Sequence, residues 1–436
     1  MLREDLIFFG ASDLAGHFRG KGFPAVDLEA RLAKGVGLAC SNIMLSAFGP
    51  IHETPFGTEG DLLLVADPTT KVEVPFEGSA TEHFYLADIK TTEGADWSCC
   101  PRSFLRRATT ALRDVAGLTI LASFEQEFVY AAGEERPGTS YGHDAFRRQG
   151  LFGEALIAAI RRAGAVPDSF LPEYGSRQFE VTVAPKPGMR AADEAVIVRE
   201  MARAVAFRLG RRVTFAPIVD VNGVGNGTHV HFSLWDEGSR PVMYDPSRPH
   251  GLSRVAEHFA GGIQHHLPAL TAVTAPSVAS YFRLRPNRWA PTWSNVGHRD
   301  RGAALRICPV SAMAPDEVSR QFNVEFRVAD ATASPYLALG ALVQAGVDGI
   351  RRELALDPPP IAGFWEMDDE GRKAAGCRPL PQSLGEAIGR LADSEAARAW
   401  FGGEFLDVYL QFKRAEARAV ADLGDEAICA RYEEAY

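Results

Sequence analysis

The nine residues 122–130 constrain the fold more than any other stretch of the chain. Their sequence, Ala-Ser-Phe-Glu-Gln-Glu-Phe-Val-Tyr, is that of a buried strand, and it carries Glu125 and Glu127 two positions apart. Side chains at i and i+2 of a strand point to the same side of a sheet. Two buried carboxylates at one spot repel each other unless a cation lies between them. The pattern therefore predicts a divalent metal site or, if this face is solvated, an ordinary surface pair.

Length and composition place the chain among globular proteins of two domains. It has 436 residues, of which 46% are hydrophobic and 23% are charged, and this length exceeds what one core usually holds. The net charge of −10 argues against nonspecific nucleic-acid binding, which needs a basic face. No apolar run reaches the roughly 18 residues that span a bilayer. The N-terminus does not resemble a signal peptide, so we expect a cytoplasmic protein that does not bind membranes.

The six cysteines are scattered along the chain and include no C-x-x-C pair. Reduced thiols are the expected state, and neither a zinc site nor a disulfide is expected.

The predicted elements change in character near Cys100-Pro101. Residues 1–95 are rich in strand patterns, and beyond them helices and strands alternate. The second pattern is typical of an α+β fold with a large antiparallel sheet and peripheral helices. The expected strands are 62–65, 82–88, 119–130, 178–183, 213–218, 228–234 and 324–328. The expected helices are 27–34, 103–115, 147–163, 191–210, 252–271, 335–353 and 383–418, with loops at 45–60 and 133–142.

Other segments offer groups that can join the two glutamates. Residues 228–234 alternate so that His229, His231 and Ser233 share one face. The strand at 324–328 places Glu325 beside Arg327. The inward-facing candidates are Glu125, Glu127, Glu173, Glu180, His229 and Glu325. Five carboxylates and one histidine suit Mg²⁺ or Mn²⁺ better than they suit a thiolate-type zinc site.

Arginines gather on both sides of Pro291. They are Arg283, Arg285, Arg288, Arg299, Arg301 and Arg306, with Arg327 further on. Guanidinium groups bind phosphate and carboxylate oxygens in a bidentate way. Carboxylates for metals beside arginines for anions are what phosphoryl transfer from a metal–nucleotide complex needs. Arg288 and Arg299 are also candidates for ordinary surface residues, and the chain has no P-loop sequence.

Taken together and in order, these segments resemble the glutamine synthetase superfamily over nearly the whole chain. The motifs that carry the resemblance include Gly60–Pro68, Phe124–Phe128, Glu173–Glu180, Gly225–Ser233, Pro276–Pro286, Arg301–Ile307 and Val324–Asp330. The resemblance implies an α+β fold with a β-grasp N-terminal domain, residues 1–100, and a catalytic domain, residues 101–436, whose curved antiparallel sheet is flanked by helices. It also implies an active site between neighbouring subunits of a homo-oligomeric ring, commonly a dodecamer of two hexameric rings.

The resemblance further assigns roles to single residues. It gives Glu127, Glu173 and Glu180 to one metal, and it gives Glu125, His229 and Glu325 to a second. The implied cofactors are ATP and two or three Mg²⁺ or Mn²⁺ ions. The residues implied for L-glutamate are Arg283 and Arg327, with Gly225 near its amino group. Those implied for ATP or its transferring phosphate are Arg301, Arg306, His231 and Ser233.

Trp289 is the most informative departure from the family pattern. It stands where ammonia-using members carry a glutamate just before Ala-Pro, and the aspartate of the family's Asp-Gly-Ser-Ser loop is not visible at 46–53. Two carboxylates that gather and deprotonate ammonium are thereby lost. A tryptophan instead offers surface for an alkyl group or a cation. The sequence thus predicts a carbon–nitrogen ligase that joins the γ-carboxylate of glutamate to an alkylamine, ethanolamine or polyamine through γ-glutamyl phosphate.

Two alternatives stay open. One is an ammonia-using glutamine synthetase with a diverged flap, and the other is a catalytically silent relative that serves as a structural or regulatory ring. The six expected metal ligands argue against the silent relative. His52 and Glu53 are candidates for the missing base. Asn323, in place of a nucleotide-contacting arginine, and Val224, in place of an asparagine, bear on the affinity for ATP and glutamate.

Overall fold

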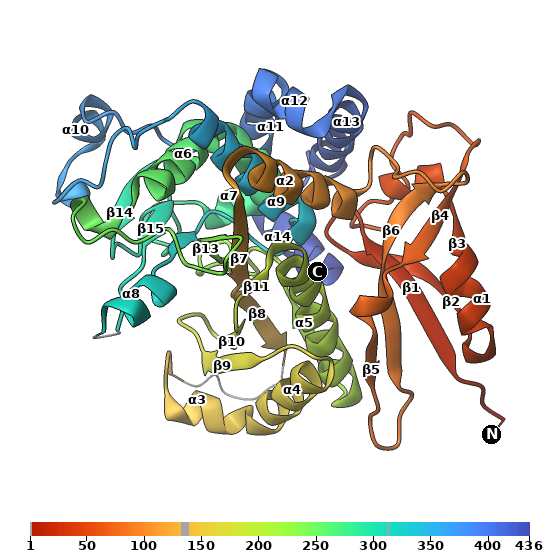
Figure 1. Cartoon of the computed structure of the whole chain (residues 1–436). Coiled ribbons are helices and arrows are strands. Elements are labelled where there is room, and N and C mark those ends of the chain that lie inside the picture. Colours follow the sequence, from red (N-terminus) through yellow and green to blue (C-terminus); the bar gives the residue numbers. More distant parts are fainter. Residues whose placement is uncertain (1, 132–138, 312–313) are drawn as a thin grey trace.

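The N-terminal part of the chain is built on strands, as the sequence predicts (Figure 1). The computed structural model describes residues 2–131, 139–311 and 314–436. The N-terminal strands are β1 (Leu6–Ser12), β2 (Phe18–Pro24), β3 (Val36–Ala39), β4 (Asp61–Ala66), β5 (Val72–Val74) and β6 (Glu82–Thr91). They form one sheet in the order β2-β1-β6-β4-β3, with β5 beside β6, and only β1 and β6 run parallel.

The two faces of this sheet bury different neighbours. Helix α1 (Leu28–Lys34) packs through Leu28 and Leu32 on the face that carries Phe9 and Tyr85. The alternate residues of β6, such as Phe84, point to the main core of the protein, as the two-residue period of a strand requires. The expected helix at 27–34 and the loop at 45–60 are confirmed.

Buried Arg102 ties the N-terminal strands to the rest of the chain. It lies in helix α2 (Pro101–Ala116) and is 4% exposed. Its guanidinium donates to Asp67 at 2.8 Å and to Asp88 at 3.2 Å on the N-terminal side, and to Asp193 at 3.1 Å on the other. Charge-assisted hydrogen bonds of this kind are strong when buried, so Arg102 fixes how the two parts meet.

Strands of the larger part belong to two sheets. The strands are β7 (Leu118–Phe124), β8 (Gln126–Ala131), β9 (Pro167–Pro172), β10 (Gln178–Val183), β11 (Lys186–Pro187), β12 (Arg212–Thr214), β13 (Val230–Asp236), β14 (Val296–His298), β15 (Leu305–Ile307) and β16 (Val324–Phe326). A four-stranded sheet has the order β12-β8-β10-β9, and a six-stranded sheet has the order β11-β7-β13-β16-β15-β14. All neighbours are antiparallel except β14 and β15.

The predicted single strand at 119–130 is wrong in one respect, because it breaks at Glu125. Up to Phe124 the chain pairs with β13, and from Gln126 it pairs with β10. The amide N–H of Glu125 donates to the carbonyl of His229 at 3.0 Å, so this residue closes one ladder before the next begins. The change of partner divides the expected sheet into two.

Helices pack around these sheets (Figure 1). The long ones are α2, α4 (Gly150–Arg162), α5 (Gly188–Arg208), α6 (Arg254–Thr274), α9 (Pro335–Arg351) and α13 (Gly403–Ala419). The short ones are α3 (His143–Arg148), α7 (Ser280–Arg283), α8 (Pro315–Gln321), α10 (Asp369–Ala374), α11 (Leu384–Ala392), α12 (Glu395–Phe401) and α14 (Asp425–Ala435). Among the described residues, no helix is both long and apolar enough to cross a membrane.

Three predicted elements are corrected by the structure. The helix expected at 147–163 is two helices that meet at Gln149, whose ψ of 16° is not helical. The helix expected at 383–418 is three, because Ser394 caps a new start and Gly402, at φ 80°, ends it. The strand expected at 213–218 ends at Thr214, where the next amide donates to the carbonyl of Tyr436 at 3.2 Å. The loop expected at 133–142 falls mostly outside the described residues.

Candidate active site

A cavity of about 510 Å³ opens where the two sheets separate at Glu125. It collects most of the residues that the sequence singles out, and it also contains Tyr141, Tyr174, Gln178 and Arg288, which sequence reasoning missed or discounted. The predicted residues that line it are Glu125, Glu127, Glu173, Glu180, Gly225, His229, Arg283, Trp289, Arg301, Arg306, Glu325 and Arg327.

One group of candidate metal ligands belongs to the six-stranded sheet. His229 precedes β13 and Glu325 lies in β16. The Nδ1 atom of His229 is 3.1 Å from a carboxylate oxygen of Glu125 and 3.4 Å from one of Glu325. One ligand atom from each of the three lies within 4.8 Å of the others, a spacing that a single cation can span.

A second group belongs to the four-stranded sheet. Glu127 of β8 and Glu180 of β10 are directly opposite in the ladder. With His229, they again offer three ligand atoms within 4.8 Å of one another. Glu173, which follows β9, lines the same cavity, but its carboxylate accepts hydrogen bonds from the Tyr141 hydroxyl and the Tyr174 amide, each at 3.0 Å.

The residue between the two glutamates is anchored from behind. Gln126 is fully buried, and the guanidinium of Arg199 in α5 donates to its side-chain oxygen at 3.1 Å. The same guanidinium donates to the carbonyl of Ala331 at 2.8 Å. Because Gln126 points to the opposite side from its neighbours, this bond fixes the backbone that presents Glu125 and Glu127.

The raised pKa values of two carboxyl groups in the second group indicate that a cation would be favourable there. Burial, together with the negative charge of Glu125 and Glu127, raises the pKa of Glu180 to about 10. Burial and the charge of Glu127 also raise the pKa of Glu173. A divalent cation would ionise such carboxyl groups, because it supplies the charge that their neighbours lack. Oxygen ligands of this kind suit a hard cation.

The first group differs because two arginine side chains already bond to one of its carboxylates. Burial acts to raise the pKa of Glu325, but His229, His231 and Arg327 outweigh it and hold that pKa below its usual value. Arg306 donates to Glu325 at 2.8 Å, and Arg327 donates to its other oxygen. Burial likewise opposes the ionisation of Glu125, yet His231 and His229 hold its pKa well below the usual range.

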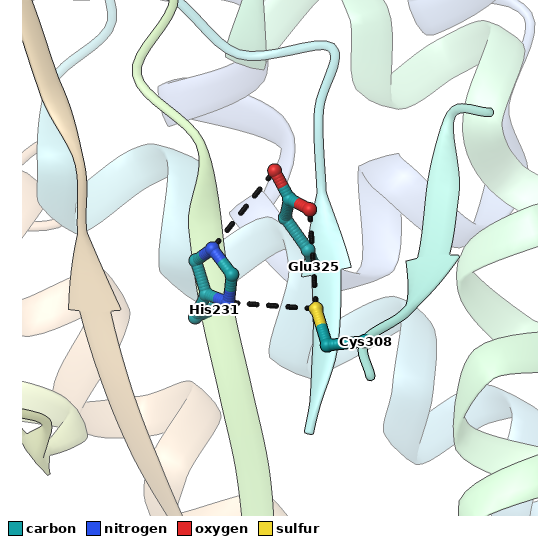
Figure 2. A group of neighbouring side chains, drawn as sticks. All are labelled: His231, Cys308 and Glu325. Carbon is teal, nitrogen blue, oxygen red and sulfur yellow. Dashed lines mark hydrogen bonds and ion pairs between the residues drawn. The ribbon is translucent and has the colours of Figure 1, made fainter. Parts of the chain in front are cut away.

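Figure 2 shows a third cluster, formed by His231, Cys308 and Glu325. The Sγ atom of Cys308 is 3.7 Å from Nδ1 of His231 and 3.9 Å from Oε2 of Glu325. His231 also contacts Glu125 through Nε2 at 3.0 Å, and Nδ1 bonds the side-chain oxygen of Asn323 at 2.9 Å. Sequence reasoning gave Cys308 no role, since only strand pairing brings it to His231.

His231 and Ser233 share one face of β13, as the alternation predicts, but neither lines the cavity. Ser233 lies further along the strand and accepts a hydrogen bond from the indole N–H of Trp235 at 2.9 Å. His231 contacts two residues that line the cavity through its Nε2 atom, Glu125 at 3.0 Å and Glu325 at 3.9 Å.

The arginines of the cavity are held by backbone carbonyls and by Glu325. Arg283, which is 2% exposed, donates to the carbonyls of Val328 at 2.9 Å and Arg327 at 3.0 Å. Gly225 is dictated by this packing, because an added Cβ would lie 2.6 Å from Cγ of Arg283 and 2.3 Å from a carbonyl oxygen. Arg288 lines the cavity and bonds the carbonyl of Val221, so it is not an ordinary surface residue. Arg299 is exposed, as expected.

Arg301 lies in a turn that a distant tryptophan holds. The carboxylate of Asp300 accepts from the amide of Gly302 at 2.9 Å and from the indole N–H of Trp365 at 2.9 and 3.0 Å. A Cβ on Gly302 would come 2.4 Å from the Trp365 ring. The Arg372 guanidinium packs over the same ring at 5.4 Å. Trp365 thus fixes the turn that presents Arg301.

Trp289 stands at the mouth of the cavity. It is 62% exposed, has a φ of 56°, and its ring centroid is 6.2 Å from that of Tyr174. An exposed indole on a left-handed backbone is unfavourable by itself, and such residues gather at functional sites. Trp289 also lines a second cavity of about 1160 Å³, to which Trp293 and Trp365 contribute.

Comparison with known proteins agrees with this fold. A family model described as the glutamine synthetase N-terminal domain matches residues 3–97, and one described as the glutamine synthetase catalytic domain matches residues 98–432. A gamma-glutamylpolyamine synthetase from Streptomyces coelicolor is 35% identical over 96% of this chain and 91% of that protein. A glutamine synthetase from Thermococcus kodakarensis is 31% identical over 95% of this chain and 89% of that protein.

A solved structure described as a novel glutamine synthase homolog is 41% identical, with a TM-score of 0.92 and coverage of 100% of this chain and 99% of that one. The chain therefore belongs to the glutamine synthetase family. It is an ATP-dependent ligase that forms a carbon–nitrogen bond, and members of its family use divalent cations, glutamate, and either an amine or ammonia. The resemblance, the α+β fold and the ligase class predicted from the sequence are confirmed.

Proposed function

We propose that the enzyme joins the γ-carboxylate of L-glutamate to a primary organic amine through γ-glutamyl phosphate. The observation that carries the proposal is Trp289, an exposed aromatic residue beside Tyr174 at the mouth of the cavity. The resemblance expects an ammonium-binding glutamate at this position. An indole supports contact with the alkyl or aromatic part of an amine. Similarity to a relative named for polyamines also favours an organic amine.

The proposed metal-binding residues are those of the two carboxylate groups. Glu127, Glu173 and Glu180 would hold one Mg²⁺ or Mn²⁺, and Glu125, His229 and Glu325 would hold another. When bound, these ions neutralise charge on the phosphoryl group as it moves from ATP. The rise in the pKa of Glu180 to about 10 supports a cation beside Glu127, Glu173 and Glu180.

The arginines would supply the rest of the electrostatic stabilisation. Arg283 and Arg327 would bind the carboxylates of glutamate, with Gly225 beside its amino group, because these residues share the cavity. Arg301 and Arg306 would face the transferring phosphate. Fixed cations aimed at developing negative charge lower the barrier to such a transfer. His231 and Ser233 would contact ATP.

The reaction then balances in two steps. An oxygen of the γ-carboxylate attacks the γ-phosphorus of ATP, the bond to the bridging oxygen breaks, and ADP leaves. The amine nitrogen attacks the acyl carbon, the carbon–oxygen bond to phosphate breaks, and the amine loses a proton to a base. Half-buried His52 is a candidate for that base, because burial lowers its pKa and keeps it neutral. His52 does not line the cavity of its own chain, so it would have to act in a neighbouring subunit.

The remaining expectations belong to the same proposal. They are a β-grasp domain at residues 1–100, a catalytic domain at 101–436, a dodecamer of two hexameric rings, and a cytoplasmic location. Mass photometry would measure the oligomer, and a monomer with full activity would contradict the shared site.

Phosphate release tests the function directly. Purified enzyme with ATP, Mg²⁺ and L-glutamate would be offered ammonium, methylamine, ethanolamine, putrescine and spermidine, with the amide identified by mass spectrometry. We expect at least one organic amine to give a kcat/KM about tenfold or more above that of ammonium. Ammonium matching the best amine would favour the second candidate, a glutamine synthetase, which similarity to the Thermococcus kodakarensis enzyme supports. Release with none of them would indicate the silent relative.

A further inference from the structure

Three side chains from distant parts of the sequence meet at one point beside the cavity. They are His231 of β13, Cys308 directly after β15, and Glu325 of β16 (Figure 2). One potential ligand atom from each lies within 4.8 Å of the other two. Cys308 and Glu325 are 6% and 1% exposed. Both are carried by backbone that pairs with neighbouring strands. The register confirms this, because His231 lies directly opposite Glu325.

The spacing is close to that of a tetrahedral zinc site. Zinc bonds to sulfur at about 2.3 Å and to nitrogen or oxygen at about 2.0–2.2 Å, so neighbouring ligand atoms lie roughly 3.3–3.7 Å apart. The distance from Cys308 Sγ to His231 Nδ1 is 3.7 Å, and that from Sγ to Glu325 Oε2 is 3.9 Å. The His231 imidazole and the Glu325 carboxylate lie 3.9 Å apart through Nε2 and Oε1. Because the ligand atoms of all three residues lie within 4.8 Å of one another, a side-chain shift of about an ångström would bring them to one ion.

The donor atoms differ in kind from those of the neighbouring groups. The two carboxylate groups described above contain oxygen and imidazole donors, whereas this cluster adds a sulfur. Thiolate and imidazole select zinc and related cations over magnesium. The oxygen of Asn323, 2.9 Å from Nδ1 of His231, is placed to replace its present hydrogen bond with a contact to the ion.

Nearby positive charge limits the affinity but does not block the site. Arg306 donates to the same Oε2 atom of Glu325 at 2.8 Å, and Arg327 bonds the other oxygen. A carboxylate oxygen has a second lone pair for a metal. Repulsion from two guanidinium groups therefore predicts a site that binds reversibly, unlike a permanent structural zinc.

We propose that a thiophilic divalent cation, with Zn²⁺ as the representative, binds at His231, Cys308 and Glu325 and inhibits the ligase. Inhibition rests on the proposed function, because it follows from withdrawing Glu325 and His231 from the metal–nucleotide site; binding does not rest on it. The sequence expectation of no zinc site depended on C-x-x-C spacing, whereas this cluster is assembled by strand pairing.

Cobalt tests the binding without any need for activity. Co²⁺ would be titrated into full-length wild type, Cys308→Ser and Cys429→Ser, and thiolate-to-cobalt absorption would be recorded. Cys429 is a buried thiol of α14, outside every group of candidate metal ligands found among the described residues. We expect the band in wild type and Cys429→Ser and its loss in Cys308→Ser. A band of equal strength in Cys308→Ser would overturn the site, and so would its absence from wild type.

Inhibition provides the second readout. At saturating Mg²⁺, Cys308→Ser should need about tenfold more Zn²⁺ for half inhibition than wild type, because one of three ligands is weakened. Equal inhibition of both would overturn the inhibitory role. If no amine supports turnover, the proposed function fails. The cobalt absorption band still shows whether the cation binds at Cys308. Thermal melting would verify that Cys308→Ser is folded, and Cys308→Ala gives a second test of the thiol.

Discussion

The carboxylate groups and the turns that carry Trp289 and Arg301 face the same cavity but are held in opposite ways. Glu325 is 1% exposed and Glu127 is 9% exposed, and both lie on paired strands. Trp289 is 62% exposed and Arg301 is also exposed, and both lie in turns outside regular elements. On the proposed assignment, the sheets fix the metal ligands, while residues in the turns can change and alter the choice of second substrate without disturbing the core.

The two regions also differ in what positions a side chain. On the strands, backbone pairing sets the place of each carboxylate. In the turns, Asn287, Trp289 and Arg299 have positive φ values, and side-chain contacts such as Trp365 to Asp300 do the positioning. Substituting a strand residue should therefore lower the free energy of unfolding. Substituting a turn residue should change only the rate or the selectivity of the enzyme.

The largest effect is expected from Glu325→Ala. The change leaves Arg306 and Arg327, 7% and 4% exposed, without their shared carboxylate. Uncompensated buried charges of this kind lower the free energy of unfolding by about 3–5 kcal/mol. Urea unfolding in EDTA would measure the loss, with Glu173→Ala as the control that removes a carboxylate from the cavity rim. Equal losses in the two variants would contradict the comparison.

The next largest effect is the change with pH in the free energy of unfolding of the metal-free protein. The folded pKa of Glu180, about 10, exceeds the unfolded value of about 4.3, so between these values the folded state binds more protons. Its contribution to stability is therefore present at low pH and is lost as pH rises. From pH 7 to 8.5 the loss is up to about 2 kcal/mol.

Urea unfolding of wild type and Glu180→Gln in EDTA would isolate this slope, because the glutamine does not titrate. Saturating Mg²⁺ should remove the slope, since a bound cation ionises the carboxyl group. A wild type whose pH dependence equals that of Glu180→Gln would show that Glu180 is ionised without metal.

A change in selectivity is expected from Trp289→Glu. The new carboxylate restores the charge that gathers ammonium and removes the indole surface. The ratio of kcat/KM for ammonium to that for the best amine should rise about tenfold, which corresponds to about 1.4 kcal/mol. Trp289→Phe, which keeps an aromatic ring without a charge, is the matched control. An unchanged ratio would mean that Trp289 does not select the second substrate.

The smallest effect is expected from Trp365→Phe. Phenylalanine keeps a ring over Gly302 but cannot donate to Asp300. Loss of about 1 kcal/mol from one positioning contact lowers kcat about fivefold, and the KM for glutamate should stay constant. Trp400→Phe, whose ring packs edge-on to His266, serves as the control. A fall in thermal stability without a fall in kcat would assign Trp365 a structural role only.

The sequence predicts the carboxylates well because two-residue alternation decides which side chains point inward. Glu125, Glu127, Glu180 and Glu325 all reach the cavity for that reason. It does not predict the break at Glu125, because the exchange of β13 for β10 as partner is a tertiary event. The place of Cys308 beside His231, and that of Trp365 beside Asp300, likewise depend on pairings between distant segments.

The bond from Arg199 to Gln126 lets helix α5, which does not line the cavity, set the spacing of the carboxylates that do. Gln126 sits between Glu125, at the junction of the two sheets, and Glu127 of β8, and Arg199 holds it at 3.1 Å. Helix α5 also packs against β7 and β8 together. If the helix slid along either strand, the gap between the two proposed ions would change with it. The packing of α5 on the far side of the sheets thus limits how far the spacing of the two proposed ions can vary.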